Sequence, residues 1–357
     1  MASQLPASLA PGPRPFCPLA RDPAAPGRRL ARLLVALLLA LAFGSAQAQP
    51  LPRLVLAGPP GAVSFPLVHM AETGALADIA RTVEFRPWRD PDQLRVLALQ
   101  GGADVLAVPT NVAANLYNRG AGIELVNVST WGILWLVSRD AGLATLADLK
   151  GRQIAMPFRA DMPDLLFGLL SEAQGLDPQR DFELRYVASP MDALQLLLAR
   201  RVDHALLAEP MVSMALLRTK HFPASVVAPD LHRSVDLQAE WGRVLDRPAR
   251  VPQAGIAVVG ALRERPDLVA RVGVAYRDSL AWCKAHAAAC GRMVAARIEM
   301  LDADAVAAAI QASPLEAVPV AQAREELEFF FDALRRRNPA SIGGRMPDEA
   351  FYGRATH

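Results

Sequence analysis

The sequence predicts an α/β fold with two similar halves and a helical C-terminal segment. Short apolar stretches that are typical of buried strands alternate with amphipathic stretches that are typical of helices. This alternation occurs in two runs along the chain, and from residue 266 to residue 337 the pattern is almost entirely helical. Alternating strands and helices indicate mainly parallel sheets with helices on both faces. We therefore expect two doubly wound α/β lobes followed by helices.

Length and composition agree with this fold class and exclude several others. The chain has 357 residues, 52% of them hydrophobic, which is enough for one large domain or two ordinary ones. Lysine and arginine number 38 against 36 aspartates and glutamates, so no basic excess indicates nucleic-acid binding. Three cysteines are too few for a disulfide framework, and the apolar content excludes a disordered chain.

The first 48 residues have the pattern of a secretory signal peptide. Three arginines between residues 28 and 32 precede an apolar run from Leu33 to Phe43, and an A-x-A motif ends at Ala48. A run of about 11 residues is too short for a membrane anchor, which needs roughly 20. We therefore expect cleavage after Ala48 and a periplasmic protein, since no later apolar run is long enough to span a membrane.

Capping residues mark the elements of the first run. Gly74 ends the first helix, and Asp90-Pro91 is an N-cap followed by proline at the first helical position. The predicted strands cover residues 53–57, 82–86, 103–108, 123–128 and 132–138, and the predicted helices cover 65–73, 91–100 and 110–118.

The second run repeats the pattern without repeating the sequence. Thr145 to Asp148 is a variant of the capping box and predicts a one-turn helix, and Ser189-Pro190 begins a longer helix. The predicted strands cover residues 153–156, 182–187, 202–207 and 255–259, and the predicted helices cover 164–173, 189–200 and a stretch after Glu209-Pro210.

The carboxyl ends of the predicted strands are the expected ligand site. In open parallel sheets, ligands bind outside these ends, where the strand order reverses. Glycines and prolines there allow close approach of backbone to a ligand, and the helix N-termini that follow offer N–H groups to an anion. The segments concerned are Gly58–Phe65, Pro109–Asn111, Pro157–Asp164 and Ala208–Pro210.

The sequence contains none of the common catalytic or metal-binding motifs. The sequence lacks a P-loop, a complete dinucleotide fingerprint and a nucleophile elbow. Four of the six histidines, His69, His204, His221 and His232, are scattered and form no zinc-binding pattern, so we expect neither a metal nor a cofactor. An exported α/β protein of this kind is expected to bind a solute rather than to convert one.

Five short motifs follow one another in a recognisable order. They are Gly101–Val105 before the Pro109-Thr110 loop, Leu146–Ala155, Ala208–Pro210, Pro266–Val269 and Gly343–Tyr352. With this order and spacing, over residues 52–352, the chain resembles the periplasmic substrate-binding proteins of ABC importers, specifically the nitrate, sulfonate, taurine and thiamine-precursor-like group. Gly58–Gly61 and Phe158–Asp161 match no subgroup, so the ligand stays open.

The resemblance implies a type II periplasmic-binding-protein clamshell that captures a small organic or anionic solute in a cleft between two lobes. One lobe would comprise residues 49–132 and 256–357, and the other residues 133–255. Two crossover strands, near residues 131–136 and 253–257, would act as the hinge. An ABC permease in the inner membrane would be the partner of a monomeric protein that is not an enzyme.

Two other functions remain open at this point. The same fold serves enzymes of thiamine-pyrimidine or menaquinone synthesis, although the leader argues against a cytosolic enzyme. A solute sensor that docks on a membrane histidine kinase is the second alternative.

The cleft loops supply the candidate ligand-binding residues. Arg159 offers a planar, charged fork suited to carboxylate, sulfonate or nitrate. Alternatively, it pairs with Asp161 or Asp164 and leaves an aspartate for a ligand amine. Glu209 can interact with the following helix or reach a ligand donor, and Trp131 either flanks the ligand or packs in the core. The full set is Gly61, Ser64, Phe65, Thr110, Asn111, Trp131, Arg159, Asp161 and Glu209.

Cys283 and Cys290 are candidates for a disulfide, because an exported protein meets an oxidising compartment. On an unbroken helix their Cα atoms would be about 10.5 Å apart, beyond the roughly 7 Å that a disulfide allows. The bond therefore needs a helix break near residues 287–289. Without one, we expect two separate thiols packed against helices.

Overall fold

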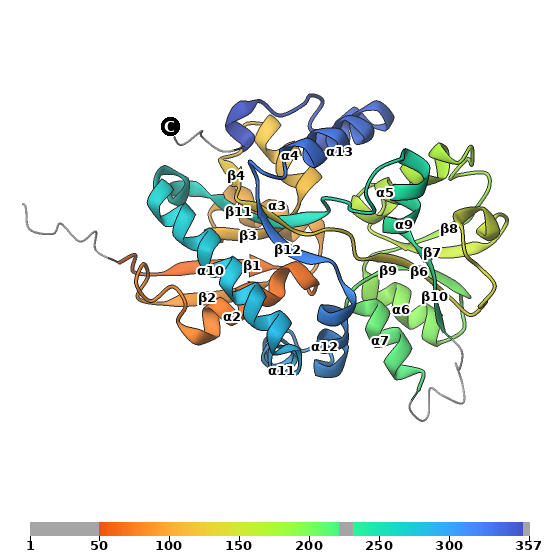
Figure 1. Cartoon of the computed structure of the whole chain (residues 1–357), viewed down its shortest axis with the longest axis horizontal. Coiled ribbons are helices and arrows are strands. Elements are labelled where there is room, and N and C mark those ends of the chain that lie inside the picture. The colour runs from red at the N-terminus through yellow and green to blue at the C-terminus, as the bar shows by residue number, and fades with distance from the viewer. Residues whose placement is uncertain (1–49, 221–230, 353–357) are drawn as a thin grey trace, which may run out of the picture. The chain divides into compact units, whose positions relative to one another are not determined.

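The computed structural model describes residues 50–220 and 231–352 (Figure 1). The expected signal peptide, residues 1–48, and His221 lie outside the described residues. The described chain forms two mixed sheets with helices packed on them, which confirms the predicted α/β class. No helix within these two stretches is long and apolar enough to cross a membrane.

The first sheet has seven strands, of which the three at one edge are parallel. They are β1 (Leu54–Gly58), β2 (Val83–Pro87), β3 (Val105–Pro109), β4 (Ile123–Leu125), β5 (Asn127–Thr130), β11 (Ala254–Val259) and β12 (Leu315–Pro319). The order is β12-β5-β11-β3-β1-β2, with β4 beside β11. β1 pairs in parallel with both β2 and β3. β11 runs antiparallel to β3 on one side and to β4 and β5 on the other.

The second sheet has five strands and the same mixture of directions. They are β6 (Leu134–Ser138), β7 (Gln153–Pro157), β8 (Glu183–Val187), β9 (His204–Ala208) and β10 (His232–Asp236). The order is β10-β6-β9-β7-β8, in which β7 pairs in parallel with β8 and β9. β6 runs antiparallel to both of its neighbours, β9 and β10. β10 and the helix after it are missing from the sequence prediction.

Side-chain alternation along the strands explains how helices cover both faces of the first sheet. Leu54 and Leu56 of β1 belong to the core that α2 (Phe65–Thr73) and α10 (Pro266–Ala285) complete. Val55 and Ala57 belong to the opposite core, which contains residues of α3 (Pro91–Gln100) and α4 (Thr110–Asn118). Successive side chains of a strand point to opposite faces, so one buried strand supplies both cores.

The second sheet is covered in the same way. α5 (Met162–Ala173) and α9 (Leu237–Leu245) pack on one face, and α6 (Pro190–Leu198) and α7 (Met211–Arg218) pack on the other. Shorter helical turns connect the elements: η1 (Ala62–Ser64), η2 (Leu146–Leu149), η3 (Gly260–Glu264), η4 (Pro339–Ile342) and η5 (Glu349–Tyr352). The predicted capping box is present at Thr145 and Asp148.

The C-terminal segment contacts helices of both sheets. It contains α11 (Ala287–Arg297), α12 (Ala303–Ala312) and α13 (Arg324–Arg337), which confirms the almost entirely helical pattern, and β12 is the one strand within it. Before α12, Asp302 pairs with Arg218 of α7 at 3.0 Å. On α13, Arg337 pairs with Glu172 of α5 at 2.8 Å. The sequence analysis assigns residues 256–357 to the first lobe. Because these ion pairs join the segment to helices of the second sheet, that assignment stays a prediction.

The chain passes between the sheets along connections that are hydrogen-bonded to each other. Val251 N donates to Trp131 O at 3.1 Å, and Gln253 N donates to Thr130 O at 3.0 Å. Gly132 has φ 108°, and a Cβ there would lie 2.0 Å from Gln238 Cγ. Only glycine fits this connection without displacing its neighbours.

Cys283 and Cys290 are joined in a disulfide with a Cα–Cα distance of 5.2 Å. α10 ends at Ala285 and α11 begins at Ala287, with non-helical dihedrals of φ −129° and ψ 48° at His286 between them. The helix break that the sequence analysis requires is thus present, one residue before the expected stretch.

Candidate functional site

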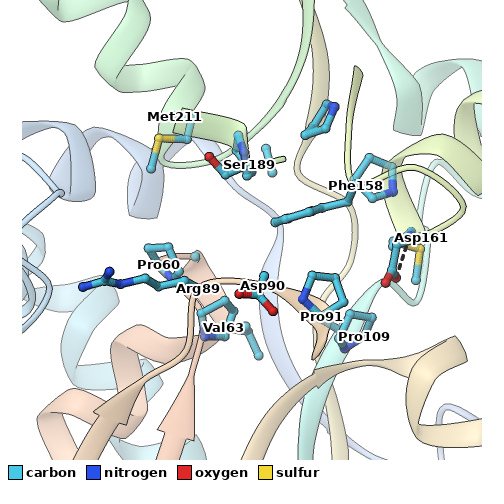
Figure 2. A pocket seen from close by; sticks show the side chains of 18 of the residues that line it. Pro60, Val63, Arg89, Asp90, Pro91, Pro109, Phe158, Asp161, Ser189 and Met211 are labelled. Atoms are coloured by element: carbon cyan, nitrogen blue, oxygen red, sulfur yellow. Dashed lines mark hydrogen bonds between the residues drawn. The ribbon is translucent and has the colours of Figure 1, made fainter. Parts of the chain in front are cut away.

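The loops that follow the strands of both sheets enclose a cavity of about 370 Å³ (Figure 2). The first sheet contributes Pro59–Val63 after β1, Trp88–Pro91 and Leu94 after β2, and Val108, Pro109 and Val112 at the end of β3. The second sheet contributes Pro157, Phe158 and Asp161–Pro163 at the end of β7, Ala188–Asp192 after β8, and Ala208, Glu209 and Met211 at the end of β9. This is the expected edge for a ligand, because the carboxyl ends of parallel strands gather there.

The lining of the cavity is mainly apolar. Trp88 and Phe158 supply aromatic rings. Seven prolines line it, at positions 59, 60, 91, 109, 157, 163 and 190, and four methionines line it, at positions 162, 191, 211 and 300. Prolines fix the backbone and carry no N–H, and methionine side chains adapt to irregular shapes. Such a lining suits the apolar body of an organic molecule better than a small ion.

The loop after β7 holds Phe158 against the cavity in an unusual backbone conformation. Phe158 has φ 55° and Ala160 has φ 61°, both in the left-handed region that non-glycine residues rarely adopt. The loop is fixed by Ala160 N, which donates to Asp164 Oδ2 at 2.7 Å, and by Asp161 N, which donates to Phe158 O. Figure 2 shows the Phe158 ring pointing into the space between Ser189 and Asp90. Such strain is typical of functional loops.

Five of the described helices begin at the cavity, and three of them have an N-terminus capped by the side chain of the residue before the helix. Asp90 Oδ1 accepts from Asp92 N and Gln93 N at 3.0 and 2.9 Å at the start of α3. Asp161 Oδ1 accepts from Met162 N at 2.9 Å at the start of α5, and Ser189 Oγ accepts from Asp192 N at 3.2 Å at the start of α6. Each of these three helices also has a proline in its first two positions. At these three helices the N–H groups expected to bind an anion are largely satisfied or absent, whereas α4 begins after Pro109 without a side-chain cap.

Glu209 is buried beside the cavity with only 2% of its surface exposed. Its Oε1 pairs with Arg233, and its Oε2 accepts from Ser213 N at 3.0 Å in the first turn of α7. Arg233 also donates to Ser213 Oγ at 3.0 Å. Both carboxylate oxygens therefore have partners, which favours the structural role among the two that the sequence left open.

Asp161 lies in the cavity wall in a largely desolvated position. Burial raises the pKa of Asp161, and the hydrogen bond from Met162 N and the charge of Arg95 oppose this shift. Arg95 Nη2 is 3.5 Å from Asp161 Oδ2 and also pairs with Asp92. The carboxylate thus shares one partly exposed cation with another acid.

Arg89 is the only lysine or arginine that lines the cavity among the described residues. Its side chain is exposed, and its guanidinium has no hydrogen-bond or ion-pair partner within residues 50–220 and 231–352. Its backbone N–H donates to Gln93 Oε1 at 2.9 Å.

The structure brings three of the nine predicted ligand residues to the cavity, namely Gly61, Asp161 and Glu209. Five others are buried elsewhere: Ser64, Phe65, Thr110, Asn111 and Trp131. Thr110 Oγ1 donates to Pro252 O at 2.5 Å, and Trp131 Nε1 donates to Glu316 O at 2.9 Å. These two polar groups therefore serve the connections between the sheets.

Arg159 is exposed and does not line the cavity. Its guanidinium lies over the ring of Tyr186, 5.0 Å from the centroid. Asp164 accepts from the Tyr186 hydroxyl at 3.0 Å and from Ala160 N. The described structure shows neither of the two arrangements that the sequence analysis offers for Arg159, a cavity cation or an ion pair with an aspartate of its loop.

The sequence analysis missed the loops after β2 and β8. Trp88, Arg89 and Asp90 come from the first loop, and Ser189 to Asp192 come from the second. A signal was available, because Asp90-Pro91 and Ser189-Pro190 both mark a strand-to-helix turn at the same type of sheet edge. In the described residues, no group of three or more His, Cys, Asp or Glu side chains is arranged to hold a metal ion.

Comparisons with known proteins agree on one kind of molecule. A family model described as "ABC transporter, phosphonate, periplasmic substrate-binding protein" matches residues 75–263. No curated protein matches the sequence.

Several solved structures share the fold. An ABC transporter protein from Parabacteroides distasonis has a TM-score of 0.69 at 20% identity, covering 84% of this chain and 98% of that one. The periplasmic aliphatic sulphonate-binding protein SsuA from Escherichia coli has 0.60 at 17%, covering 83% and 92%. The periplasmic nitrate-binding protein NrtA from Synechocystis has 0.63 at 13%, covering 81% and 82%. At these identities the likeness concerns the fold and leaves the ligand open.

Proposed function

The chain belongs to the family of periplasmic substrate-binding proteins of phosphonate-type ABC transporters, and on that premise we propose that the cavity between its two sheets is the solute-binding site. As a member of this family it is the substrate-binding component of an ABC transporter, with a small molecule as ligand and a permease as partner. The solved relatives named for a ligand are binding proteins and not enzymes.

One observation carries the proposal: loops from both sheets line the same cavity. A solute held there contacts both sheets at once, so it stabilises the arrangement in which they lie close together. Micromolar binding corresponds to about −8 kcal/mol, which a largely buried organic molecule with a few hydrogen bonds can supply.

We further propose that the protein closes around its solute and acts in the periplasm. Residues 49–132 with 256–357 and residues 133–255 would be two lobes that close on the solute, and the hydrogen-bonded connections around Trp131 and Gln253 would be their hinge. Cleavage after Ala48 would release the protein into the periplasm as a monomer.

A cavity-filling variant tests the site. Gly61 lines the cavity, and a Cβ there would meet only Pro59 Cγ, at 3.8 Å. Gly61→Phe should therefore fold and occupy part of the space. Wild type and variant are screened by thermal shift against anions, aromatic carboxylates, pyrimidines and amines. A ligand at 100 times its Kd adds about 2.7 kcal/mol of stability, and we expect that gain in the wild type only.

A further inference from the structure

We propose that the cavity selects an organic solute with an apolar body that is uncharged or positively charged, and that it rejects small oxyanions. This inference rests on the proposed function, because it assumes that the cavity is the solute site. It differs from what the phosphonate, sulphonate and nitrate relatives suggest by their names.

The cavity offers few hydrogen-bond donors to an oxyanion. An oxyanion site needs several free N–H groups or a cation directed at the anion. Here the N-termini of α3, α5 and α6 are occupied by Asp90, Asp161 and Ser189, and prolines remove further donors. Glu209 accepts from Ser213 N at the start of α7, and α4 has no side-chain cap. At four of the five helices that begin at the cavity, the chain's own side chains therefore fill the position that an oxyanion would take.

The charges around the cavity favour a cation over an anion. Four carboxylates line the cavity, on Asp90, Asp161, Asp192 and Glu209, against the single guanidinium of Arg89. Arg233 balances Glu209, and Arg95 lies near Asp161. Asp90 and Asp192 have no ion-pair partner in the described part of the chain. An anion therefore meets uncompensated negative charge, whereas a cation meets attraction.

The size and the apolar lining of the cavity favour an organic solute over a small ion. A cavity of about 370 Å³ falls in the range of sites for small organic ligands. A nitrate or a methylphosphonate would leave most of the methionine and proline surface without contacts.

The test uses probes that share one apolar body and differ in charge. Benzylamine, benzyl alcohol and benzoate are titrated into the purified protein, together with nitrate and methylphosphonate, which lack that body. The readouts are the thermal shift and the calorimetric Kd, and Gly61→Phe is the matched control. We expect benzylamine and benzyl alcohol to raise the Tm of the wild type alone. We expect benzoate to bind at least about tenfold more weakly than benzylamine, and the oxyanions to give no shift.

The outcomes separate the two proposals. Tighter binding of benzoate or of either oxyanion in the wild type, abolished in Gly61→Phe, overturns this inference and leaves the proposed function standing. Absence of any shift with both benzylamine and benzyl alcohol also overturns it. Equal shifts in wild type and Gly61→Phe overturn the proposed function itself, because the probes would then bind outside the cavity.

Discussion

The guanidinium of Arg250 lies over the indole of Trp131, 3.9 Å from the ring centroid. Trp131 is in the connection between β5 and β6, and Arg250 is in the returning connection before β11. Glu316 joins both, because its carbonyl accepts from Trp131 Nε1 at 2.9 Å and its carboxylate lies 3.3 Å from Arg250. Three separate stretches of chain therefore meet at the Trp131 side chain, where the chain passes between the sheets.

Replacing Trp131 should destabilise the whole protein. The side chain is 1% exposed, so Trp131→Ala leaves a large cavity and breaks the contacts with Arg250 and Glu316. We expect the free energy of unfolding, measured in urea, to fall by about 3–5 kcal/mol. Trp282→Ala, at a half-buried tryptophan away from the connections, is the control and should cost less. Equal losses in the two variants would contradict this role for Trp131.

Local patterns suffice to predict most of the fold. The helix expected over residues 65–73 has those bounds in the structure, and the caps at Asp90 and Ser189 are formed as predicted. These features depend on neighbours within a turn or two of chain, which a sequence displays directly. β12 depends instead on pairing with β5, far away in the sequence, and follows a helix that gives no sign of it.

The site was harder to predict than the fold because it depends on strand order. Met300 sits between two helices of the C-terminal segment and still lines the cavity with Pro60 from the first strand loop. The sequence favours Arg159 as the ligand cation because its loop follows a strand. The position of a loop, however, does not fix the direction of a long side chain, and the Tyr186 ring offers this one a competing partner.

Stability should decrease as the pH falls below 6.5. Burial lowers the pKa of both His69 and His204 from 6.5, and the charge of His286 adds to the effect at His69. The unfolded histidines take up protons near 6.5 while the folded ones stay neutral. The unfolded state therefore binds more protons and is favoured as the pH falls from 6.5 toward the lower folded pKa values.

Urea unfolding on both sides of pH 6.5 measures this effect. His204→Asn keeps an amide near Ser138 Oγ, which lies 2.8 Å from His204 Nδ1 in the wild type, and removes one titrating group. The variant should therefore lose less stability on acidification than the wild type. A wild type that gains stability over this range would contradict the prediction.

Loss of the disulfide should weaken the packing of α10 and α11. Cys283 and Cys290 are fully buried, and the bond ties the end of one helix to the start of the next. Replacing both by serine should lower the free energy of unfolding by about 2–4 kcal/mol. Thiol labelling of the unreduced, unfolded wild type should find neither cysteine free, and two labelled thiols would show that the bond is not formed in the periplasm.

Substitution should have a small effect at Arg159 and a large one at Glu209. Arg159 contacts the Tyr186 ring at the surface, so Arg159→Ala should change ligand affinity and unfolding free energy little, by about 1 kcal/mol at most. Glu209 holds Arg233 and caps α7 in a buried position, so Glu209→Ala leaves a charge without its partner and should cost about 3–5 kcal/mol of stability. Glu209→Gln keeps an acceptor for Ser213 N and should recover part of that loss. Calorimetric titration with the strongest binder of the thermal-shift screen, alongside urea unfolding, measures both effects.

A drop in ligand affinity of tenfold or more in Arg159→Ala, with the free energy of unfolding unchanged, would contradict the prediction for Arg159. It would mean that Arg159 is the ligand-binding cation that its loop first suggests. The loop after β7 would then have to turn that side chain into the cavity when the solute binds.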